Sequence, residues 1–312
     1  MWGTLREGGR GREVARDLVA SLASTKFGLR ALNAIYDKTG DRSKHRFYLL
    51  FGNIFINRPN SVYCDDWCVT VPGGELKIPL GKDETWLDWG MAVSLLGHDQ
   101  EVKQTYAAIV SSGERPAQFI DVGANYGSHS LLLHTSGVPT LSFEPNPGCV
   151  TYLKRWAAAN DISPDIEQVA LGDGCGDVSF DFPIKATWLG MISDKEELPE
   201  GYQRITVPLR RLDDYMDRLA PGPLLIKLDA EGAEPAIIRG SVRLITERCP
   251  MIIFECWEDP TARQELVDAF AGRFEFYSLP WSPIGNSPPM NSAEFVRASG
   301  TNFIAVPRAV AV

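Results

Sequence analysis

The sequence predicts an α/β fold in which a largely parallel sheet is covered by helices on both faces. From Gln118 onward, segments of strand length alternate with segments of helix length, which is the pattern of βαβ units. The strand segments are apolar throughout, as expected for strands buried on both faces. A chain of 312 residues with 44% apolar residues is long enough to bury one large core.

The residues before this alternation predict an extension. Val14, Leu18 and Leu22, followed by Leu29, Leu32 and Ile35, recur at helical spacing. Short strands and turns are expected over residues 51–79, with Pro-Gly-Gly at 72–74 as one turn. We therefore expect residues 1–80 to form a helical and β extension for oligomerisation or as a lid, and residues 81–312 to form the main domain.

The main domain is predicted to begin with a helix over 100–113, with Asp99 as its N-cap. Strands are expected at 118–123, 140–145, 165–171, within 224–232 with Asp229 at the strand end, and at 251–257, 274–279 and 301–307. Helices are expected at 129–137, 148–160, 234–249 and 261–272. A hairpin formed by 177–183 and 205–212 should enclose an irregular segment that contains Trp188.

The charge is unevenly distributed along the chain. The net charge is −9, and residues 1–46 carry ten Lys or Arg against five Asp or Glu. The rest of the chain is therefore strongly acidic, which argues against a nucleic-acid partner. No apolar run is long enough to cross a bilayer, and the N-terminus does not resemble a signal peptide. The six cysteines form no Cys-x-x-Cys pair, so we expect a reduced, cytoplasmic protein.

The stretch FIDVGANYGSHS, residues 119–130, has the form of a ligand-binding turn between a strand and a helix. It is not a P-loop, because no lysine follows Gly127. A dinucleotide-binding loop requires a glycine where Asn125 stands. Asp121 would repel a pyrophosphate, but it suits a ligand with a cationic ammonium group.

Glu144 is the next acid at a strand end, 23 residues after Asp121. A carboxylate at this position accepts hydrogen bonds from ribose hydroxyls. An adenosine joined to an amino acid without phosphate satisfies both carboxylates, and S-adenosylmethionine is such a molecule. An NAD-linked oxidoreductase and a non-catalytic binding module with the same fold remain the alternatives.

Four segments, in order, resemble the FkbM-type methyltransferase family: FIDVGANYGSHSLLL, SFEPNP, LIKLDAEGAEPAIIRG and NFIAVP. The resemblance extends from about Asp99 to Pro307. It implies a Rossmann-like class I methyltransferase fold, with a seven-stranded, mostly parallel sheet in the order 3-2-1-4-5-7-6 and an antiparallel last strand. It also implies S-adenosylmethionine as cofactor, S-adenosylhomocysteine as product, and O-methylation of a hydroxyl of a small molecule, sugar or natural product.

The resemblance also implies which residues contact the cofactor. Those that face its methionine part or close the turn are Asp121, Gly123, Ala124, Asn125, Tyr126 and Gly127. Those near the ribose and adenine are Glu144, Pro145, Asn146, Ala170 and Leu171. Asp229 would lie where methyl donor and acceptor meet. For each of these residues the alternative is a structural role, as a turn, a loop acid or part of the core.

The sequence KLDAEGAE, residues 227–234, places several charged groups at the end of a central strand. An alcohol acceptor benefits from a base that removes its proton, and we expect Asp229 or Glu231 to be this residue or to orient the acceptor. Lys227 would neutralise these acids, and Glu234 would begin the next helix. The carboxylates could instead hold a metal ion, but methyl transfer needs none and we expect none.

Aromatic residues in loops are candidates for the acceptor site, because they form flat apolar walls. Trp188 and Trp257 are expected to bind the acceptor, and Trp86, Trp89 and Trp281 are further candidates. Each could instead fill space in the core. We also expect a homodimer through the N-terminal helices, with an apolar face formed by Leu22, Leu29 and Leu32.

Overall fold

The structure is a computed structural model, and it describes residues 10–52, 54–55, 65–81, 87–113, 115–184, 189–193, 196–285 and 288–308. The chain forms two compact units. The first comprises Met1–Val71 and Glu75–Gln100, and the second Pro72–Gly74 and Glu101–Val312. Two tryptophans proposed for the acceptor site, Trp86 and Trp188, lie outside the described residues.

The first unit contains the predicted helices and hairpin. Its elements are α1 (Arg10–Ala23), α2 (Lys26–Asp37), α3 (Asp41–Phe51), β1 (Asp66–Val71), β2 (Gly74–Pro79) and α4 (Trp89–Gly97). Phe51 ends a helix instead of beginning a strand, and most of the strand region predicted over 51–64 lies outside the described residues. Helix α4 was not predicted. Nearly all its side chains are buried, so its sequence lacks the polar face that reveals a helix.

The apolar face predicted to bind a second copy is largely used inside the first unit. Leu29 and Leu32 are buried, and only Leu22 is exposed. Next to them, the Asn33 side chain accepts a hydrogen bond of 2.9 Å from the Trp89 indole. The expectation for Leu29 and Leu32 was therefore wrong, because α2 turns both of them inward.

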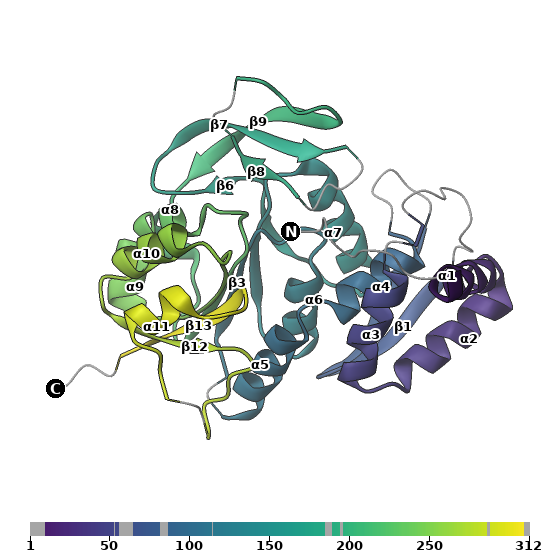
Figure 1. The fold of residues 1–312 in the computed structure, drawn as a ribbon. Helices are drawn as coiled ribbons and strands as arrows, with labels where there is room; N and C mark the ends of the chain where they lie inside the picture. Colours follow the sequence, from purple (N-terminus) through teal and green to yellow (C-terminus); the bar gives the residue numbers. More distant parts are fainter. Residues whose placement is uncertain are drawn as a thin grey trace. The chain divides into compact units, whose positions relative to one another are not determined.

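The second unit is built on a seven-stranded sheet in the order β5-β4-β3-β10-β11-β13-β12, shown in Figure 1. Its strands are β3 (Gln118–Val122), β4 (Thr140–Phe143), β5 (Asp165–Glu167), β10 (Leu224–Leu228), β11 (Met251–Glu255), β12 (Phe274–Ser278) and β13 (Asn302–Pro307). Strand β13 pairs antiparallel with both β11 and β12, and all other pairs in this sheet are parallel. This confirms the predicted order 3-2-1-4-5-7-6.

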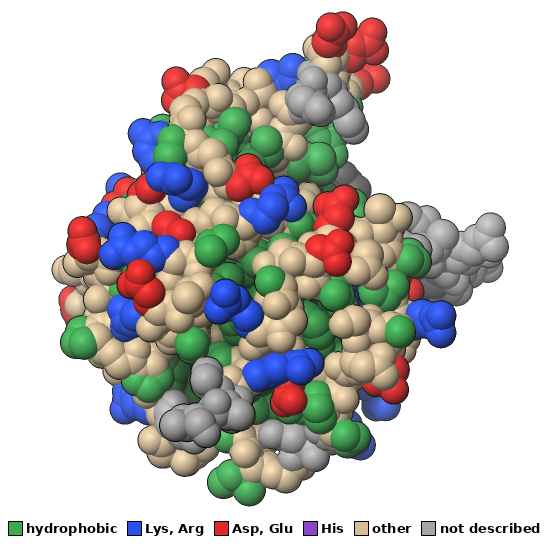
Figure 2. All heavy atoms as spheres, turned by 90° about the vertical axis from the view of Figure 1, so that its left-hand side faces the viewer, with side chains coloured by type: hydrophobic (Ala, Val, Ile, Leu, Met, Phe, Trp, Pro, Cys, Tyr) green, Lys and Arg blue, Asp and Glu red, His purple; other side chains and the backbone are tan. Residues whose placement is uncertain are grey.

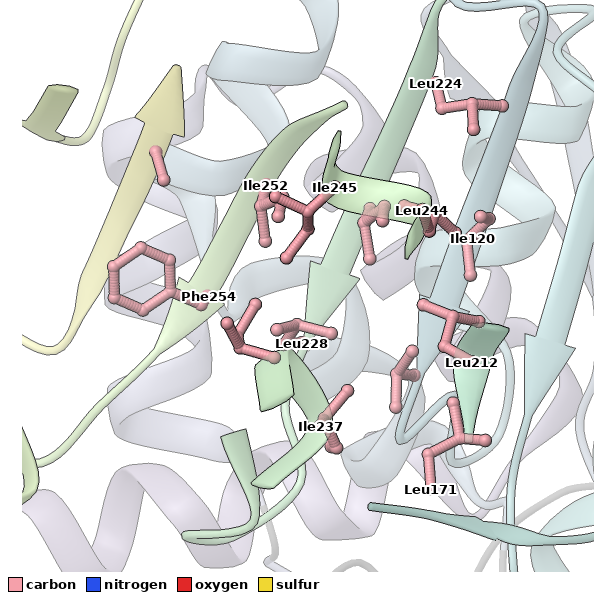
Figure 3. Close-up of a cluster of buried hydrophobic side chains, with 14 of the residues drawn as sticks. Ile120, Leu171, Leu212, Leu224, Leu228, Ile237, Leu244, Ile245, Ile252 and Phe254 are labelled. Atoms are coloured by element: carbon pink, nitrogen blue, oxygen red, sulfur yellow. The ribbon is translucent and has the colours of Figure 1, made fainter. Parts of the chain in front are cut away.

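Helices cover both faces of this sheet. Helices α5 (Gln100–Ser111), α6 (Ser128–Thr135) and α7 (Pro147–Ala159) lie on one side. The other side carries the 3-10 helix η1 (Leu212–Arg218), α8 (Glu234–Arg239), α9 (Val242–Arg248), α10 (Pro260–Ala269) and α11 (Ser292–Arg297). Figure 3 shows the core on this second side, where Ile120, Leu228 and Ile252 of the strands meet Leu244 and Ile245 of α9.

Two predicted elements are divided in the structure. The strand predicted over 165–171 separates into β5 and β6 (Ala170–Leu171), and β6 belongs to a second sheet in the order β6-β9-β7-β8. The other strands of that sheet are β7 (Gly176–Pro183), β8 (Met191–Ile192) and β9 (Tyr202–Arg210). The predicted hairpin is confirmed by the antiparallel pairing of β7 with β9.

The helix predicted over 234–249 divides into α8 and α9 because a distant residue caps the second half. The Asp213 carboxylate of η1 accepts hydrogen bonds from the backbone of Arg243 and Leu244, at 2.9 and 2.8 Å. The Asp213 backbone N–H in turn donates to the Gly240 carbonyl at 3.2 Å. A side chain from another element thus acts as the cap of α9.

Asp99 was predicted to be the N-cap of α5, but its backbone does not fit that role. Its φ is +50°, whereas N-cap residues are extended. Its carboxylate lies 3.0 Å from His98 Nδ1. Asp99 therefore makes the bend before α5 and pairs with its neighbour.

The surface over α9 and α10 carries mixed charges. Figure 2 shows Lys and Arg interspersed with Asp and Glu on the described part of this face. Among the described residues, none of the helices combines the length and apolar character needed to span a bilayer.

Candidate functional site

The turn after β3 is held against two neighbouring strands. The backbone N–H groups of Gly123 and Ala124 both donate to the Phe143 carbonyl at 3.0 Å. Gly123 has a φ of +77°, and a Cβ there would lie 1.8 Å from the Asp229 carbonyl oxygen. Asn125 has a φ of +53°. Only glycine fits at position 123, because the turns after β3 and β10 touch there.

The end of this turn packs on α7. Tyr126 is buried and makes an edge contact with Tyr152, with ring centroids 5.2 Å apart. A Cβ on Gly127 would lie 2.5 Å from Leu153 Cγ. The Tyr126 side chain thus packs in the core between the turn and α7.

Asp121 is fully buried and only partly satisfied. Its Oδ2 accepts a hydrogen bond of 2.6 Å from Ser130, whose hydroxyl lies 2.7 Å from that of Ser142. Its Oδ1 is buried and makes no hydrogen bond within the described residues. A buried carboxylate oxygen without a donor is costly, so Oδ1 is suited to accept a hydrogen bond from a ligand.

Glu144 joins the turn after β3 to the start of α7. Its carboxylate accepts backbone hydrogen bonds from Asn125 at 2.7 Å and from Asn146 at 2.8 Å. Burial raises the pKa of Glu144 to about 7, against the lowering effect of these two hydrogen bonds, and the nearby Asp121 and Asp229 add to the rise. Each carboxylate oxygen keeps a second lone pair, which a ribose hydroxyl could use.

Asn146 has a further role as the N-cap of α7. Its side chain accepts a hydrogen bond of 2.9 Å from the Gly148 backbone. Pro145, between Glu144 and Asn146, is half-buried. The predicted group Glu144, Pro145 and Asn146 therefore lies beside the turn after β3.

We predict that Glu144→Gln alters the pH dependence of stability. The wild-type pKa of about 7 lies above its ordinary value of 4.5, so ionisation costs the folded state free energy as pH rises between these values. The shift corresponds to about 3 kcal/mol. In urea unfolding, the stability of the wild type relative to Glu144→Gln should therefore fall by that order between pH 5 and pH 8. Because Glu231 is present in both proteins, its contribution cancels in the difference between their free energies of unfolding. If this difference were the same at pH 5 and pH 8, the prediction would be refuted.

Ala170 and Leu171 form β6 and are both buried. Ala170 packs with Phe180, Phe182 and Val207 of the second sheet. Leu171 belongs to the large core (Figure 3). Both side chains contribute to packing, and their contact with adenine stays a prediction.

The turn after β10 begins with a buried ion pair. Lys227 is 2% exposed, and its ammonium lies 2.6 Å from Asp229 Oδ2. The Asp229 backbone N–H donates to the Val122 carbonyl at 3.0 Å, which fixes it beside the turn after β3. This confirms that Lys227 neutralises an acid of this cluster.

Glu234 shapes the loop between β10 and α8. Its carboxylate accepts backbone hydrogen bonds from Ala230 at 2.7 Å and from Gly232 at 3.0 Å. Glu231 lies between them with a φ of +51°. Burial raises the pKa of Glu231 to about 7, with additional contributions from Asp229 and Glu234. The loop therefore holds a carboxylate that changes protonation near neutral pH.

A pocket that is open to solvent lies beside this loop, at the ends of β10 and β11. It is lined by Asp229, Glu231, Gly232, Glu234, Pro235, Glu255, Cys256, Trp257, Ala262 and Leu266. Trp257 is 53% exposed, and its contact with an acceptor stays a prediction. Trp89 and Trp281 are buried, so they belong to the core instead. No group of three or more His, Cys, Asp or Glu within the described residues is arranged to hold a metal ion.

The loop after β11 is held by a buried arginine. Arg263 is 1% exposed and donates to the carbonyls of Trp257 at 3.1 Å, Phe295 at 3.3 Å and Gly300 at 2.5 Å, and also to Ala298. Arg263 thereby fixes the backbone of Trp257, which is one of the residues that line the pocket.

Four residues of the site were not predicted from the sequence. Ser130 donates a hydrogen bond to Asp121, and the Ser142 hydroxyl lies next to that of Ser130. Glu255 and Cys256 line the pocket. Ser142 could have been noticed, because it is a polar residue inside the apolar strand TLSF. Nothing in the sequence of β11 indicates that its end faces the loop after β10.

The chain is similar in sequence to known methyltransferases. The model of the methyltransferase FkbM domain matches residues 121–277. Methyltransferase sdnD of Sordaria araneosa is 25% identical over 178 residues, which cover 47% of this chain and 69% of that protein.

Two solved structures are similar at low identity. The methyltransferase FkbM from Methylobacillus flagellatus KT has 15% identity and a TM-score of 0.39, over 72% of this chain and 56% of that chain. The SAM-dependent methyltransferase from Agrobacterium tumefaciens has 10% identity and a TM-score of 0.41, over 80% and 72%. The family match extends from the aspartate at the end of β3 to Tyr277 in β12 and spans slightly more than half of the chain. The chain therefore belongs to the FkbM methyltransferase family.

Proposed function

We propose that the chain is a Rossmann-like class I enzyme that uses S-adenosylmethionine to methylate a hydroxyl of a small molecule, sugar or natural product. The observation that carries this proposal is the buried Oδ1 of Asp121, which makes no hydrogen bond within the described residues. It lies at the end of β3, two residues before a glycine that cannot carry a Cβ. An ammonium group of a ligand would satisfy that oxygen and neutralise the buried charge.

The residues around Asp121 fit the rest of this cofactor. Glu144 lies close enough to Asp121 for the two charges to interact, and its remaining lone pairs suit ribose hydroxyls. The turn has Asn125 where a pyrophosphate-binding loop needs glycine, which disfavours an NAD-linked reaction. When bound, the cofactor supplies a methyl group on a sulfonium, which is a good leaving group.

The loop after β10 would then serve the acceptor. We assign to Glu231 the role of the base that accepts the hydroxyl proton, because a pKa of about 7 suits proton transfer near neutral pH. Asp229, held by Lys227, would orient the acceptor. A Glu231→Gln variant that formed S-adenosylhomocysteine at the wild-type rate would remove Glu231 from this role.

We predict that S-adenosylhomocysteine, and not NADH, stabilises the protein against heat. A ligand at 100 times its Kd stabilises the folded state by about 2.7 kcal/mol, which corresponds to a rise in Tm of about 4 °C for a chain of this size. Thermal unfolding with each ligand at equal concentration measures this. A rise in Tm with NADH alone would favour the oxidoreductase alternative. If neither ligand raised the Tm, the alternative of a non-catalytic binding module would be favoured.

A further inference from the structure

We infer that the pocket at the ends of β10 and β11 binds a neutral, unphosphorylated sugar ring as the methyl acceptor. This inference rests on the proposed function, because it identifies the acceptor of that reaction. It is carried by three properties of the pocket: its place beside Asp229 and Glu231, its exposed indole, and the charges of its lining.

The pocket lies next to the cofactor turn without sharing it. Leu228 of β10 pairs with Phe254 of β11, so the residues that follow both strands meet at one edge of the sheet. No residue of 121–127 or 144–146 lines the pocket, but Asp229 lines it and touches Gly123 through its backbone. An acceptor in this pocket would therefore lie beside a ligand bound at Asp121.

The aromatic wall of the pocket suits a sugar ring. The pocket is open to solvent, so a bound ring would rest against its wall instead of being enclosed. The Trp257 side chain is 53% exposed, although indoles are usually well buried. A pyranose presents C–H groups on its ring face, which pack on an aromatic surface, and hydroxyls around its edge.

The lining excludes anionic acceptors. Four carboxylates line the pocket, those of Asp229, Glu231, Glu234 and Glu255, and no Lys, Arg or His is among the lining residues that the structure describes. A phosphate or carboxylate would be repelled without a compensating cation. Sugar phosphates and nucleotide-linked phosphates therefore fit this pocket poorly.

The same carboxylates favour a neutral ligand over a cationic one, because much of their charge is compensated. Asp229 is paired with Lys227 at 2.6 Å, and both oxygens of Glu234 accept backbone hydrogen bonds. The pKa of Glu231 is raised to about 7, so near neutral pH it is a mixture of acid and carboxylate. Such a group can both donate to and accept from a sugar hydroxyl.

The test uses the full chain and saturation-transfer NMR with sugars as probes. The neutral probes are the methyl glycosides of glucose, galactose, mannose, rhamnose and fucose, and glucosamine and glucuronate are charged counterparts. Each is measured with and without S-adenosylhomocysteine. We expect at least one neutral glycoside to bind more strongly than both charged sugars. Trp257→Ala should weaken that binding at least fivefold, whereas Val242→Ala, which changes an exposed apolar residue outside the pocket, should not.

Three results would overturn the inference: no neutral glycoside binds, a charged sugar binds best, or Trp257→Ala binds the glycoside as the wild type does. Calorimetric titration of the same samples with S-adenosylhomocysteine tests the proposed function separately. Sugar binding without cofactor binding would refute the methyltransferase proposal but leave the sugar site. Cofactor binding without sugar binding would refute the sugar site but leave the methyltransferase proposal.

Discussion

Asp121→Asn should abolish measurable binding of S-adenosylhomocysteine without weakening the fold. The asparagine oxygen can keep the hydrogen bond from Ser130 that Asp121 Oδ2 accepts at 2.6 Å. The negative charge that would pair with the ligand ammonium is lost, and the loss of one partner of a buried ion pair costs about 2–5 kcal/mol. We therefore expect the Kd to rise about thirtyfold or more.

The same substitution should leave the ligand-free protein at least as stable as the wild type. A buried polar group without a hydrogen bond costs about 1–3 kcal/mol, and more when it is charged, and Asp121 Oδ1 is such a group in the described structure. Calorimetry and thermal unfolding measure the two effects. Asp173→Asn is the control, because Asp173 is half-exposed and pairs with Arg239. Wild-type affinity in Asp121→Asn would refute the cofactor site.

Gly123→Ala should destabilise the protein far more than Gly113→Ala. Both glycines have positive φ, +77° and +84°, which costs an alanine about 1–2 kcal/mol. At position 123 the new Cβ would also lie 1.8 Å from the Asp229 carbonyl oxygen, whereas at position 113 nothing lies within 4 Å. The collision must separate the turns after β3 and β10, so we expect a total cost of about 4 kcal/mol or more.

Urea unfolding of the two variants beside the wild type measures this difference. Because the two glycines have similar φ angles, the comparison separates the collision from the cost of a positive φ. Equal destabilisation would mean that the two turns do not touch, and the site would lose the contact that joins its cofactor and acceptor sides.

The sequence was sufficient to predict the alternating strands and helices and the glycine turn after β3, because these depend on local patterns. The strand order was predicted only from the resemblance to the FkbM family. Apolar strands alternate with helices, and Gly123 and Gly127 follow a strand that ends in Asp121. These patterns reflect the period of each element and the backbone freedom of glycine.

The features that escaped prediction depend on contacts between distant residues. The break between α8 and α9 follows from hydrogen bonds to Asp213, 30 and 31 residues away. Ala170 was expected in the same strand as Asp165, but it pairs with β9 instead. The pocket was missed because it combines the ends of two strands, and Glu255 has no local signal.

Glu144 and Glu234 share a consequence for how this site could change over time. Each holds its loop through backbone N–H groups, at Asn125 and Asn146 for one and at Ala230 and Gly232 for the other. Every amino acid except proline carries that group. The anchoring itself therefore uses no side chain of the residues held. The positive φ of Asn125 and Gly232 and the cap that Asn146 forms for α7 still restrict three of these positions. Ala230, between two residues that line the pocket, is thus the position where a mutation can most readily change the surface beside the pocket while the loop keeps its form.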